Sequence, residues 1–492
     1  MTAGSPAREP SRAAAGASRA AHDRSGPVLA TVCVAFFMTM LDTTIVNIAL
    51  PDIQDRLDAS LTQALWVVNS YTLVFAVLLL TFGRLGDRYT PRTMFLAGLA
   101  TFTVASALCG LAQDPTQLIA ARGLQGAGAA MLMPQTLTLI TTTFPLERRG
   151  FAFGVWSGVA GLATVAGPTA GGLLVDTLTW RSIFLVNLPL GLVALAGGYA
   201  LIPERASRRV RAAGLDLAGI LLSAGGLFLT VFALLEGQRY DWQASIVVLG
   251  GAGLVLLAGF LLHQRTRQDG APLLPFELFG RQNFTLMNAV LMAALFATVA
   301  LLLVYTLYLQ SVRGLTPAEA GLVLAPPAVA TLLISPVMGR LADRVDPRLV
   351  FPPGLALFAT GFLLLLAASG RDTDVLLLLP GMIVCGVGAG IVFAPANALA
   401  MRDVPPALAG AASGVISTLR QVGTLLGAVV VGAVLQAGVS EAPATGRFDQ
   451  DAYTDAMPAA IWTVVGVLTV AAIASTRTHR PQPSTPSERQ TS

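Results

Sequence analysis

The sequence GRLGDRYTPR at residues 83–92 returns as GRLADRVDPR at residues 339–348, and this repeat decides the fold. Seven positions are identical, each pair lying 256 residues apart: Gly83, Arg84, Leu85, Asp87, Arg88, Pro91 and Arg92 match Gly339, Arg340, Leu341, Asp343, Arg344, Pro347 and Arg348. Weaker matches follow at a spacing of 260, where Gly126, Gly128, Gly150, Gly154, Ser157 and Gly167 match Gly386, Gly388, Gly410, Gly414, Ser417 and Gly427. The repeats predict two homologous halves in parallel orientation, a design that lets two helical bundles rock around a site in the middle of a membrane.

The composition excludes a soluble protein. Of the 492 residues, 54% are hydrophobic and 12% are charged, whereas soluble domains have about 25% charged residues. The three cysteines and three histidines form no ligand-spaced cluster, so neither a metal site nor a disulfide framework is predicted. The chain contains no lysine and therefore no lysine-containing phosphate loop, which excludes an ATP-driven pump. We expect no cofactor and, because the arginines are spread over many short loops, no nucleic acid.

Fourteen apolar runs are long enough to cross a membrane at about 20 residues per helix. They lie at 28–50, 65–83, 94–112, 116–137, 151–175, 181–202, 214–236, 244–263, 284–309, 317–338, 349–369, 375–399, 410–437 and 456–475. Because the runs are continuous and do not alternate with a period of two, they predict helices rather than a β-barrel. The expected fold is an all-α membrane protein with two parallel six-helix repeats and an inserted two-helix hairpin, which makes fourteen transmembrane helices.

The arginines orient these helices, because positive residues concentrate on the cytoplasmic side of a membrane. With the N-terminus inside, 23 arginines fall in inner segments and 6 in outer segments, and two lie within spans. This predicts a multi-pass protein of the cell membrane with both termini in the cytoplasm. The predicted domains are a disordered cytoplasmic tail at 1–26, an N-terminal six-helix bundle at 27–203, an inserted hairpin at 204–270, a C-terminal six-helix bundle at 271–476 and a cytoplasmic tail at 477–492.

Asp42 is the sole acidic residue well inside a span, where a low dielectric disfavours its charged form. Such a group can bind and release a proton as water access changes sides. From the rise of a helix, Asp42 lies about 9 Å and Arg122 about 10 Å from the outer face. We therefore predict that the two charges face each other and that protonation of Asp42 frees Arg122. The alternatives are a purely structural ion pair and an arginine that bonds only backbone carbonyls.

Other polar and aromatic residues within spans either line a substrate cavity or bridge helices by hydrogen bonds. The candidates are Asn47, Asn69, Gln125, Asn187, Tyr305, Tyr308 and Arg420, together with Gln310, Asn397, Trp66, Tyr71, Trp156 and Phe296. No acidic residue in its own half has a depth that obviously matches Arg420. A helix end, a substrate or a water-filled cavity is therefore its expected partner.

Glycine-rich segments are candidates for moving parts. The run at 151–175 contains Gly161, Gly167, Gly171 and Gly172, which allow close helix contact, and Pro168, which should kink the helix. The repeated loops contribute Gly83, Asp87, Arg88 and Arg92, and in the second half Gly339, Asp343 and Arg344. Asp87 is expected to cap a helix N-terminus or to pair with an arginine across the two halves, which would hold one conformation. Dense packing and topology-setting arginines are the plainer alternatives.

Taken together, these motifs resemble the major facilitator superfamily, in particular its fourteen-helix branch of drug/proton antiporters of the multidrug efflux type. The resemblance covers residues 28–475 and rests on LDTTIVNIALP at 41–51, WVVNSYTL at 66–73, the repeated loop, the segment around Arg122, GPTAGG at 167–172 and WRSIFLVNLPLG at 180–191. It implies export of amphiphilic, often cationic, compounds in exchange for protons. It also implies coupling roles for Asp42 and Arg122, and conformational roles for Asp87, Arg88, Gly167 and Pro168.

Three hypotheses follow for the function. The first is a proton-coupled antiporter that exports amphiphilic drugs or antibiotics by alternating access, with a small substrate, protons and the lipid bilayer as its partners and a monomer as its working form. The second is a dedicated exporter of one endogenous metabolite or antibiotic. The third, from another class, is a receptor or scaffold that transports nothing. None of the three is an enzyme.

Overall fold

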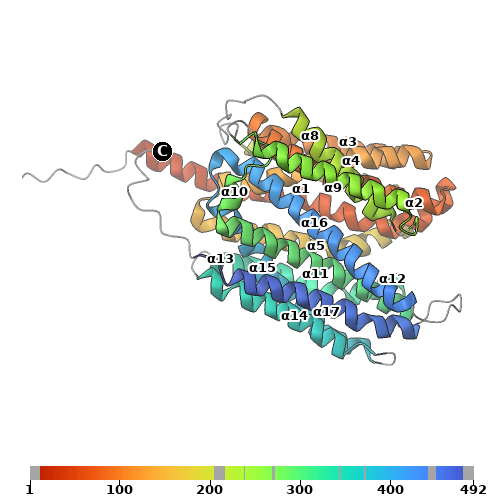
Figure 1. The fold of residues 1–492 in the computed structure, drawn as a ribbon. Helices are drawn as coiled ribbons and strands as arrows, with labels where there is room; N and C mark the ends of the chain where they lie inside the picture. The colour runs from red at the N-terminus through yellow and green to blue at the C-terminus, as the bar shows by residue number, and fades with distance from the viewer. Residues whose placement is uncertain are drawn as a thin grey trace, which may run out of the picture.

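The computed structural model describes residues 12–203, 216–237, 239–268, 272–342, 345–370, 373–440 and 450–479, and every regular element in these ranges is helical. Long helices run side by side along one direction (Figure 1). In chain order the elements are α1 (Arg12–Leu57), α2 (Leu61–Tyr89), α3 (Pro91–Leu111), α4 (Pro115–Thr143), α5 (Leu146–Thr177), α6 (Ser182–Leu185), α7 (Asn187–Leu201), α8 (Leu217–Glu236), α9 (Ala244–Arg265), α10 (Glu277–Gly280), α11 (Gln282–Leu307), the π-helix η2 (Tyr308–Val312), α12 (Pro317–Val323), α13 (Ala325–Ala342), η3 (Pro347–Leu349), α14 (Phe351–Ala367), η4 (Val375–Leu378), α15 (Leu379–Arg402), η5 (Pro406–Leu408), α16 (Ala409–Ser440) and α17 (Gln450–Ser475).

Each predicted apolar run coincides with a helix or with two consecutive helices. The run at 317–338 is divided into α12 and α13, because Pro326 and Pro327 lack the amide hydrogens that a continuous helix needs. The run at 181–202 is divided into α6 and α7. The N-terminal tail departs from the prediction, since α1 begins at Arg12, within the stretch 1–26 that was expected to be disordered. Residues 1–11, 204–215 and 480–492 lie outside the described residues.

Twelve of the described helices, some joined to a short neighbour, are long and apolar enough to cross a membrane. A thirteenth is gained if α5 counts as one span, because its segments Leu146–Thr164 and Thr169–Thr177 meet at 42°. This bend lies where a kink at Pro168 was predicted. Helix α4 has 29 residues but is not among the twelve. Its buried Arg122, Gln125 and Gln135 lower its mean hydropathy. Helix α4 is therefore long enough to cross a membrane but less apolar than the twelve.

The internal repeat is preserved in three dimensions. A side-chain carbon added to Gly126 would lie 2.5 Å from the carbonyl oxygen of Tyr71, and one added to Gly386 would lie 2.5 Å from Cα of Pro327. These partners are themselves 256 residues apart, as are Phe102 and Phe358, which approach Gly128 and Gly388 in the same way. Glycine is required at these points because the backbones of neighbouring helices touch. The two halves therefore use the same packing.

The halves meet mainly along two helix pairs, α2 with α16 and α5 with α13, and α4 also contacts α16 while α5 also contacts α15. A side-chain carbon on Gly83 would lie 2.5 Å from Cα of Gly414, and one on Gly154 would lie 2.5 Å from Cα of Pro336. In the second pair, Gly339 touches Gly150. This contact is the repeat counterpart of the contact between Gly83 and Gly410 in the first pair. We call the end of the molecule that carries the loops 83–92 and 339–348 the repeat-loop end. The closest contacts between the halves lie at this end.

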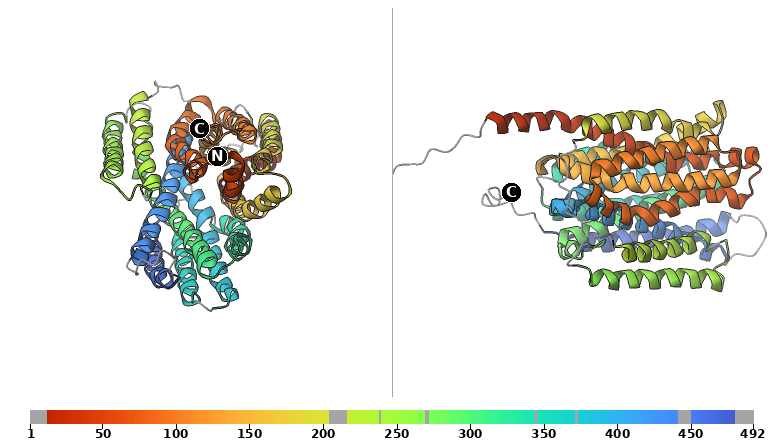
Figure 2. Two further views of the ribbon diagram at one scale, coloured as in Figure 1. Left: turned by 90° about the vertical axis from the view of Figure 1, so that its right-hand side faces the viewer. Right: turned by 90° about the horizontal axis from the view of Figure 1, so that it is seen from above.

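Helices α8 and α9 form an antiparallel hairpin at one side of the molecule (Figure 2). Its α8 packs mainly on α2 and also contacts α16, so the hairpin touches both halves. One end of the hairpin is held by Asp216, which accepts hydrogen bonds from Gly219 N at 2.9 Å and Gln264 Nε2 at 2.6 Å and pairs with His263 Nε2 at 2.8 Å. Burial alone would raise the pKa of Asp216, but these three contacts outweigh burial and lower it.

Replacing Asp216 by asparagine should lower the thermal unfolding midpoint at pH 7, and the difference from wild type should shrink as the pH falls below about 4. A carboxyl group whose folded pKa is lowered adds stability above its unfolded pKa of about 3.9 and loses it as the pH passes down through the folded value. Thermal melts of the detergent-solubilised protein across this range test the sign. Asp374→Asn, which removes an exposed cap of η4, is the matched control. A difference that grows on acidification would contradict the assignment.

Candidate functional site

Asp42 of α1 and Arg122 of α4 form a buried ion pair within the N-terminal half. Arg122 Nη1 donates to Asp42 Oδ2 at 2.5 Å, and the two side chains are 1% and 0% exposed. Matched depths on different helices had predicted that these charges face each other, and the contact is confirmed. A charge pair buried this deeply needs further hydrogen bonds to offset the loss of water around both ions.

Those further bonds come from a small polar network. Asp42 Oδ1 accepts from Gln125 Nε2 at 2.7 Å and from Asn187 Nδ2 at 3.2 Å. Ser106 of α3 links the two amides, accepting from Asn187 at 3.0 Å and from Gln125 at 3.3 Å. Gln125 and Asn187 were candidates either for a cavity wall or for hydrogen-bonded bridges between helices, and the structure shows the second: they do not line the cavity, are fully buried and bond the Asp42 carboxylate.

Arg122 is fixed from several sides. Its Nε donates to the Val67 carbonyl at 3.1 Å, and its Nη1 also donates to Gln125 Oε1 at 2.7 Å. The guanidinium lies 4.4 Å from the ring centroid of Tyr71 and 5.8 Å from that of Phe184. Arg122 thereby joins α1, α2 and α4. Arg122 therefore forms both an ion pair and a hydrogen bond to a backbone carbonyl, the two kinds of contact considered from the sequence.

The second half has no equivalent of this network. At the repeat spacing of 260, Arg122 and Gln125 correspond to Met382 and Cys385 of α15, both buried. The halves share their packing glycines but differ in their polar interiors. Among the described residues, a buried carboxylate held in a network of this kind is found only in the N-terminal half.

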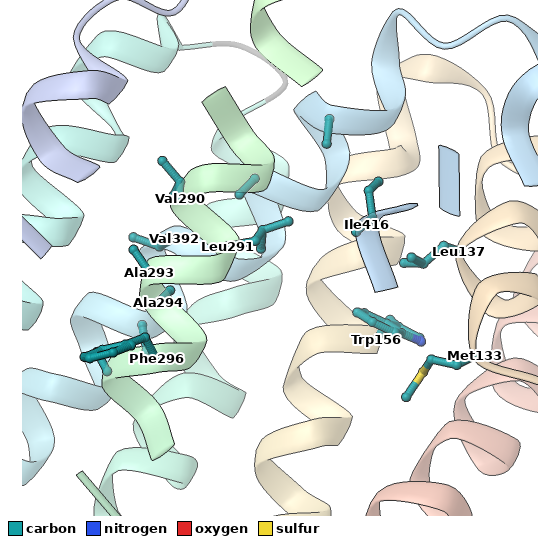
Figure 3. Close-up of a cluster of buried hydrophobic side chains, with 14 of the residues drawn as sticks. Met133, Leu137, Trp156, Val290, Leu291, Ala293, Ala294, Phe296, Val392 and Ile416 are labelled. Atoms are coloured by element: carbon teal, nitrogen blue, oxygen red, sulfur yellow. The ribbon is translucent and has the colours of Figure 1, made fainter. Parts of the chain in front are cut away.

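A cavity of about 200 Å³ lies between the halves. Its wall includes residues of α1 and α5 from the first half and of α11, α13, α14, α15 and α16 from the second. Trp156 of α5 stands at this wall and stacks on Phe36, with ring centroids 4.1 Å apart. Figure 3 shows Trp156, Met133 and Leu137 across from Phe296 and other apolar side chains of α11. Ligand sites commonly have volumes of about 300–1,000 Å³, so the cavity in this conformation suits a small molecule.

Of the predicted cavity residues, Arg420 and Trp156 line this cavity, and the others do not. Tyr305 and Tyr308 are instead buried in the C-terminal half, where their hydroxyls bond Ser369 Oγ at 3.1 Å and the Gly370 carbonyl at 2.7 Å. Asn47 is exposed and bonds the Thr43 carbonyl of its own helix at 3.4 Å. Asn69 is half-buried and is not part of the wall. The polarity of a residue within a span did not predict which side chains line the cavity, because most of these polar groups form hydrogen bonds inside one bundle.

Helix α1 connects the cavity with the ion pair. Met40, Thr43 and Thr44 line the cavity, while Asp42 between them points into the N-terminal bundle. In a helix, successive side chains point about 100° apart, so one short segment serves both sites. Asp42 is not among the residues that line the cavity.

Asp87 of α2 ties the two halves together at the repeat-loop end. Its carboxylate accepts from the backbone N–H groups of Gly410 at 2.7 Å and Ala411 at 2.9 Å, at the start of α16, and from Arg84 Nη1 at 3.0 Å. A carboxylate at a helix N-terminus is stabilised by the unpaired N–H groups and the helix dipole. Of the two predicted roles, the capping of a helix N-terminus is confirmed, and the capped helix belongs to the other half. The arginine that pairs with Asp87 is Arg84 of the same helix rather than one across the two halves. Close by, Thr138 and Ser413 bond across the same interface at 2.8 Å.

The other motif residues have more local contacts. Arg92 donates to the Tyr199 carbonyl at 2.7 Å, Arg88 lies over the Tyr89 ring, and both therefore stay within the N-terminal half. On α5, Gly161 touches Ala328 across the interface, Gly167 and Gly171 touch Thr44 and Ile45 of α1, and Gly172 faces open space. The side chain of Pro168 and the whole of Asp343 and Arg344 lie outside the described residues.

Replacing Asp87 by asparagine should loosen the repeat-loop end. The variant loses a charge at the α16 N-terminus and turns an amide donor toward a backbone donor, at a cost of about 1–2 kcal/mol. Maleimide labelling of a cysteine placed at the buried Ser413 should then proceed up to about tenfold faster than with Asp87 intact. Asp114→Asn, which removes the charge from the N-cap of α4 within one half, should leave labelling unchanged. Equal labelling rates in all three backgrounds would contradict a clamp at Asp87.

Known proteins resemble this chain in sequence and in structure. The sequence model described as Major Facilitator Superfamily matches residues 32–218 and 194–428. The chain is 37% identical over 410 residues to the multidrug resistance protein Stp of Mycobacterium tuberculosis, covering 83% of this chain and 75% of that protein. It is 36% identical over 439 residues to the probable actinorhodin transporter of Streptomyces coelicolor, covering 87% and 75%.

The structure of the human organic anion transporter MFSD10 superposes with a TM-score of 0.65 at 13% identity, covering 92% of this chain and 99% of that one. The fold is therefore the same as in a solved transporter. The chain belongs to the major facilitator superfamily. It is a multi-pass membrane transporter rather than an enzyme.

Proposed function

We propose that this transporter is a proton-coupled antiporter that exports amphiphilic drugs or antibiotics by alternating access. The observation that carries the proposal is the fully buried Asp42–Arg122 pair, in which Asp42 lies on the same segment of α1 as the cavity-lining Met40, Thr43 and Thr44. A carboxylate that is excluded from water and held by one arginine can exchange a proton only when the surrounding helices move. Relatives named as a multidrug resistance protein and an antibiotic transporter support the direction of transport.

Protonation of Asp42 would remove the negative charge to which Arg122, Gln125 and Asn187 donate hydrogen bonds. The link between α1 and α4 would weaken, and α1 could shift together with Met40, Thr43 and Thr44 at the cavity. With Asp42 charged, the repeat-loop end is clamped by Asp87 and the glycine contacts. Proton binding is thus proposed to favour opening of that end, and proton release to favour its closure.

The proposal also includes a topology for the chain in the membrane. Helices α4 and α5 are taken to cross the membrane despite their polar and bent segments, which completes fourteen spans. Both termini and the repeat-loop end then lie in the cytoplasm, and the transporter works as a monomer in the cell membrane with small amphiphilic substrates and protons as its partners. Arginine placement supports this orientation.

A dedicated exporter of one antibiotic is the second candidate. It is favoured by the relative named as a probable actinorhodin transporter and by a cavity of about 200 Å³, which is below the range of about 300–1,000 Å³ that is common for ligand pockets. The two candidates differ in substrate range and share one mechanism.

Purified protein in vesicles that enclose a pH-sensitive dye tests the proposal. Adding each of a panel of amphiphilic antibiotics on the cytoplasmic side should move protons in the opposite direction to the antibiotic. Movement with many compounds supports a multidrug antiporter, and movement with one supports a dedicated exporter. Antibiotic transport that leaves the dye unchanged, or no transport of any compound, would overturn the proposal. Empty vesicles with the same gradient are the control.

A further inference from the structure

The charge of the cavity is carried by one side chain. Among the described residues that line it, Arg420 is the only arginine, and neither aspartate nor glutamate contributes. The remaining wall is made of apolar and aromatic side chains with a few hydroxyls, such as Thr43 and Thr298. In a partly enclosed apolar space the field of such a charge is screened less than in open water.

Arg420, which is half-buried, also differs from Arg122, the fully buried arginine within a span. Arg122 is matched by a carboxylate, an amide and a backbone carbonyl, as described above. The guanidinium of Arg420 has no hydrogen-bond acceptor or ion-pair partner among the described residues; its recorded contact is with the Trp156 ring, 5.0 Å from the ring centroid. Withdrawing a cation from water without a counter-ion is unfavourable, so an anion that enters the cavity would gain strong charge-assisted bonds.

Asp42, the acid proposed to carry the proton, does not offset the positive charge of Arg420. Asp42 turns its carboxylate into the N-terminal bundle, where both oxygens are already bonded. A cation in the cavity would therefore meet a like charge at Arg420 and no opposite charge on the wall. The field selects against cations as well as for anions.

The apolar part of the wall suits a flat ring. Trp156 is braced by Phe36, and Phe358 and Phe393 stand on the opposite, C-terminal side. Ser157, next to Trp156 in sequence, also lines the cavity, and its hydroxyl has no hydrogen-bond partner among the described residues. Aromatic rings and aromatic walls pack favourably in this kind of site.

We infer that the cavity accepts small aromatic anions, such as ring systems that carry a carboxylate or sulfonate, with Arg420 binding the anionic group. This rests on the proposed transport function and names its substrate class. It differs from the cationic compounds that family resemblance alone would suggest. Arg420 comes from the second half and the proton site from the first, so substrate and proton are held by different bundles.

Isothermal titration of the purified full-length protein with a matched pair of probes tests the inference. The probes are 2-naphthalenesulfonate and (2-naphthyl)trimethylammonium, which share a ring system and have opposite charges. Wild type should bind the sulfonate at least about tenfold more tightly than the ammonium compound. Arg420→Gln should lose this preference, and Arg420→Lys should retain part of it. Arg239→Gln, which removes a half-exposed arginine at the end of the hairpin, should bind as wild type does.

The inference is overturned if wild type binds the ammonium probe as tightly as the sulfonate, or if Arg420→Gln leaves sulfonate affinity within about twofold. Thermal melts identify any variant that fails to fold, in which case the Arg420→Lys protein decides. Binding is measured without a proton gradient, so its outcome is independent of coupling. Anion preference without proton movement would refute only the proposed antiport, and proton movement without anion preference would refute only the substrate class.

Discussion

Asp42→Asn is expected to abolish substrate-driven proton movement while leaving substrate binding intact. The amide cannot take up or release a proton, and its nitrogen would meet the donor nitrogens of Gln125 and Asn187 until these amides turn over. Binding should survive because Asp42 does not line the cavity. Proton flux in dye-loaded vesicles should fall to the level of empty vesicles, and the affinity for substrate should stay within about twofold of wild type.

Asp55→Asn is the matched control, because it neutralises an exposed acid at the end of the same helix. Its proton flux should equal that of wild type. If Asp42→Asn still moves protons with substrate, another group carries the proton and the ion pair is structural.

Arg122→Gln has the largest expected effect on stability. It leaves the Asp42 carboxylate buried without its counter-ion, which costs about 3–5 kcal/mol when one partner of a buried pair is removed. It also removes the donor to the Val67 carbonyl and the contact with Tyr71. The thermal unfolding midpoint of the detergent-solubilised protein should fall well below that of wild type.

The double variant Asp42→Asn/Arg122→Gln should regain much of that loss, since two amides can bond each other and no charge is stranded. Such recovery is the signature of direct coupling in a double-mutant cycle. Additive losses in the double variant, or a single Arg122→Gln protein as stable as wild type, would show that the pair contributes little.

The sequence predicted the fold well because its signals are physical constraints of the bilayer. Apolar runs of spanning length and the repeated loop led directly to the helices and to two similarly packed halves. The Asp42–Arg122 contact also followed, since opposite charges at one depth in an apolar bundle have few other ways to be satisfied. Asp87 was predictable for a related reason, as an acid beside glycines at a helix end.

The cavity was not predictable in the same way. Tyr305 and Asn187 are polar residues in spans, as Arg420 is, yet they bond within their own bundles. Which face of a helix meets the other half depends on packing that one sequence does not reveal. Ser106 and the threonines of the cavity wall had no distinguishing signal, because hydroxyl residues commonly bond their own helix backbone in apolar segments.

The central claim is that the proton on Asp42 decides whether the repeat-loop end is open. Spin labels at the exposed positions Tyr89 and Leu349 report the distance between the two halves at that end in lipid nanodiscs. The account predicts a short distance in wild type at high pH that lengthens as the pH falls, and a long distance in Asp42→Asn at every pH. An Asp42→Asn protein that keeps the short distance and the pH response of wild type would contradict it.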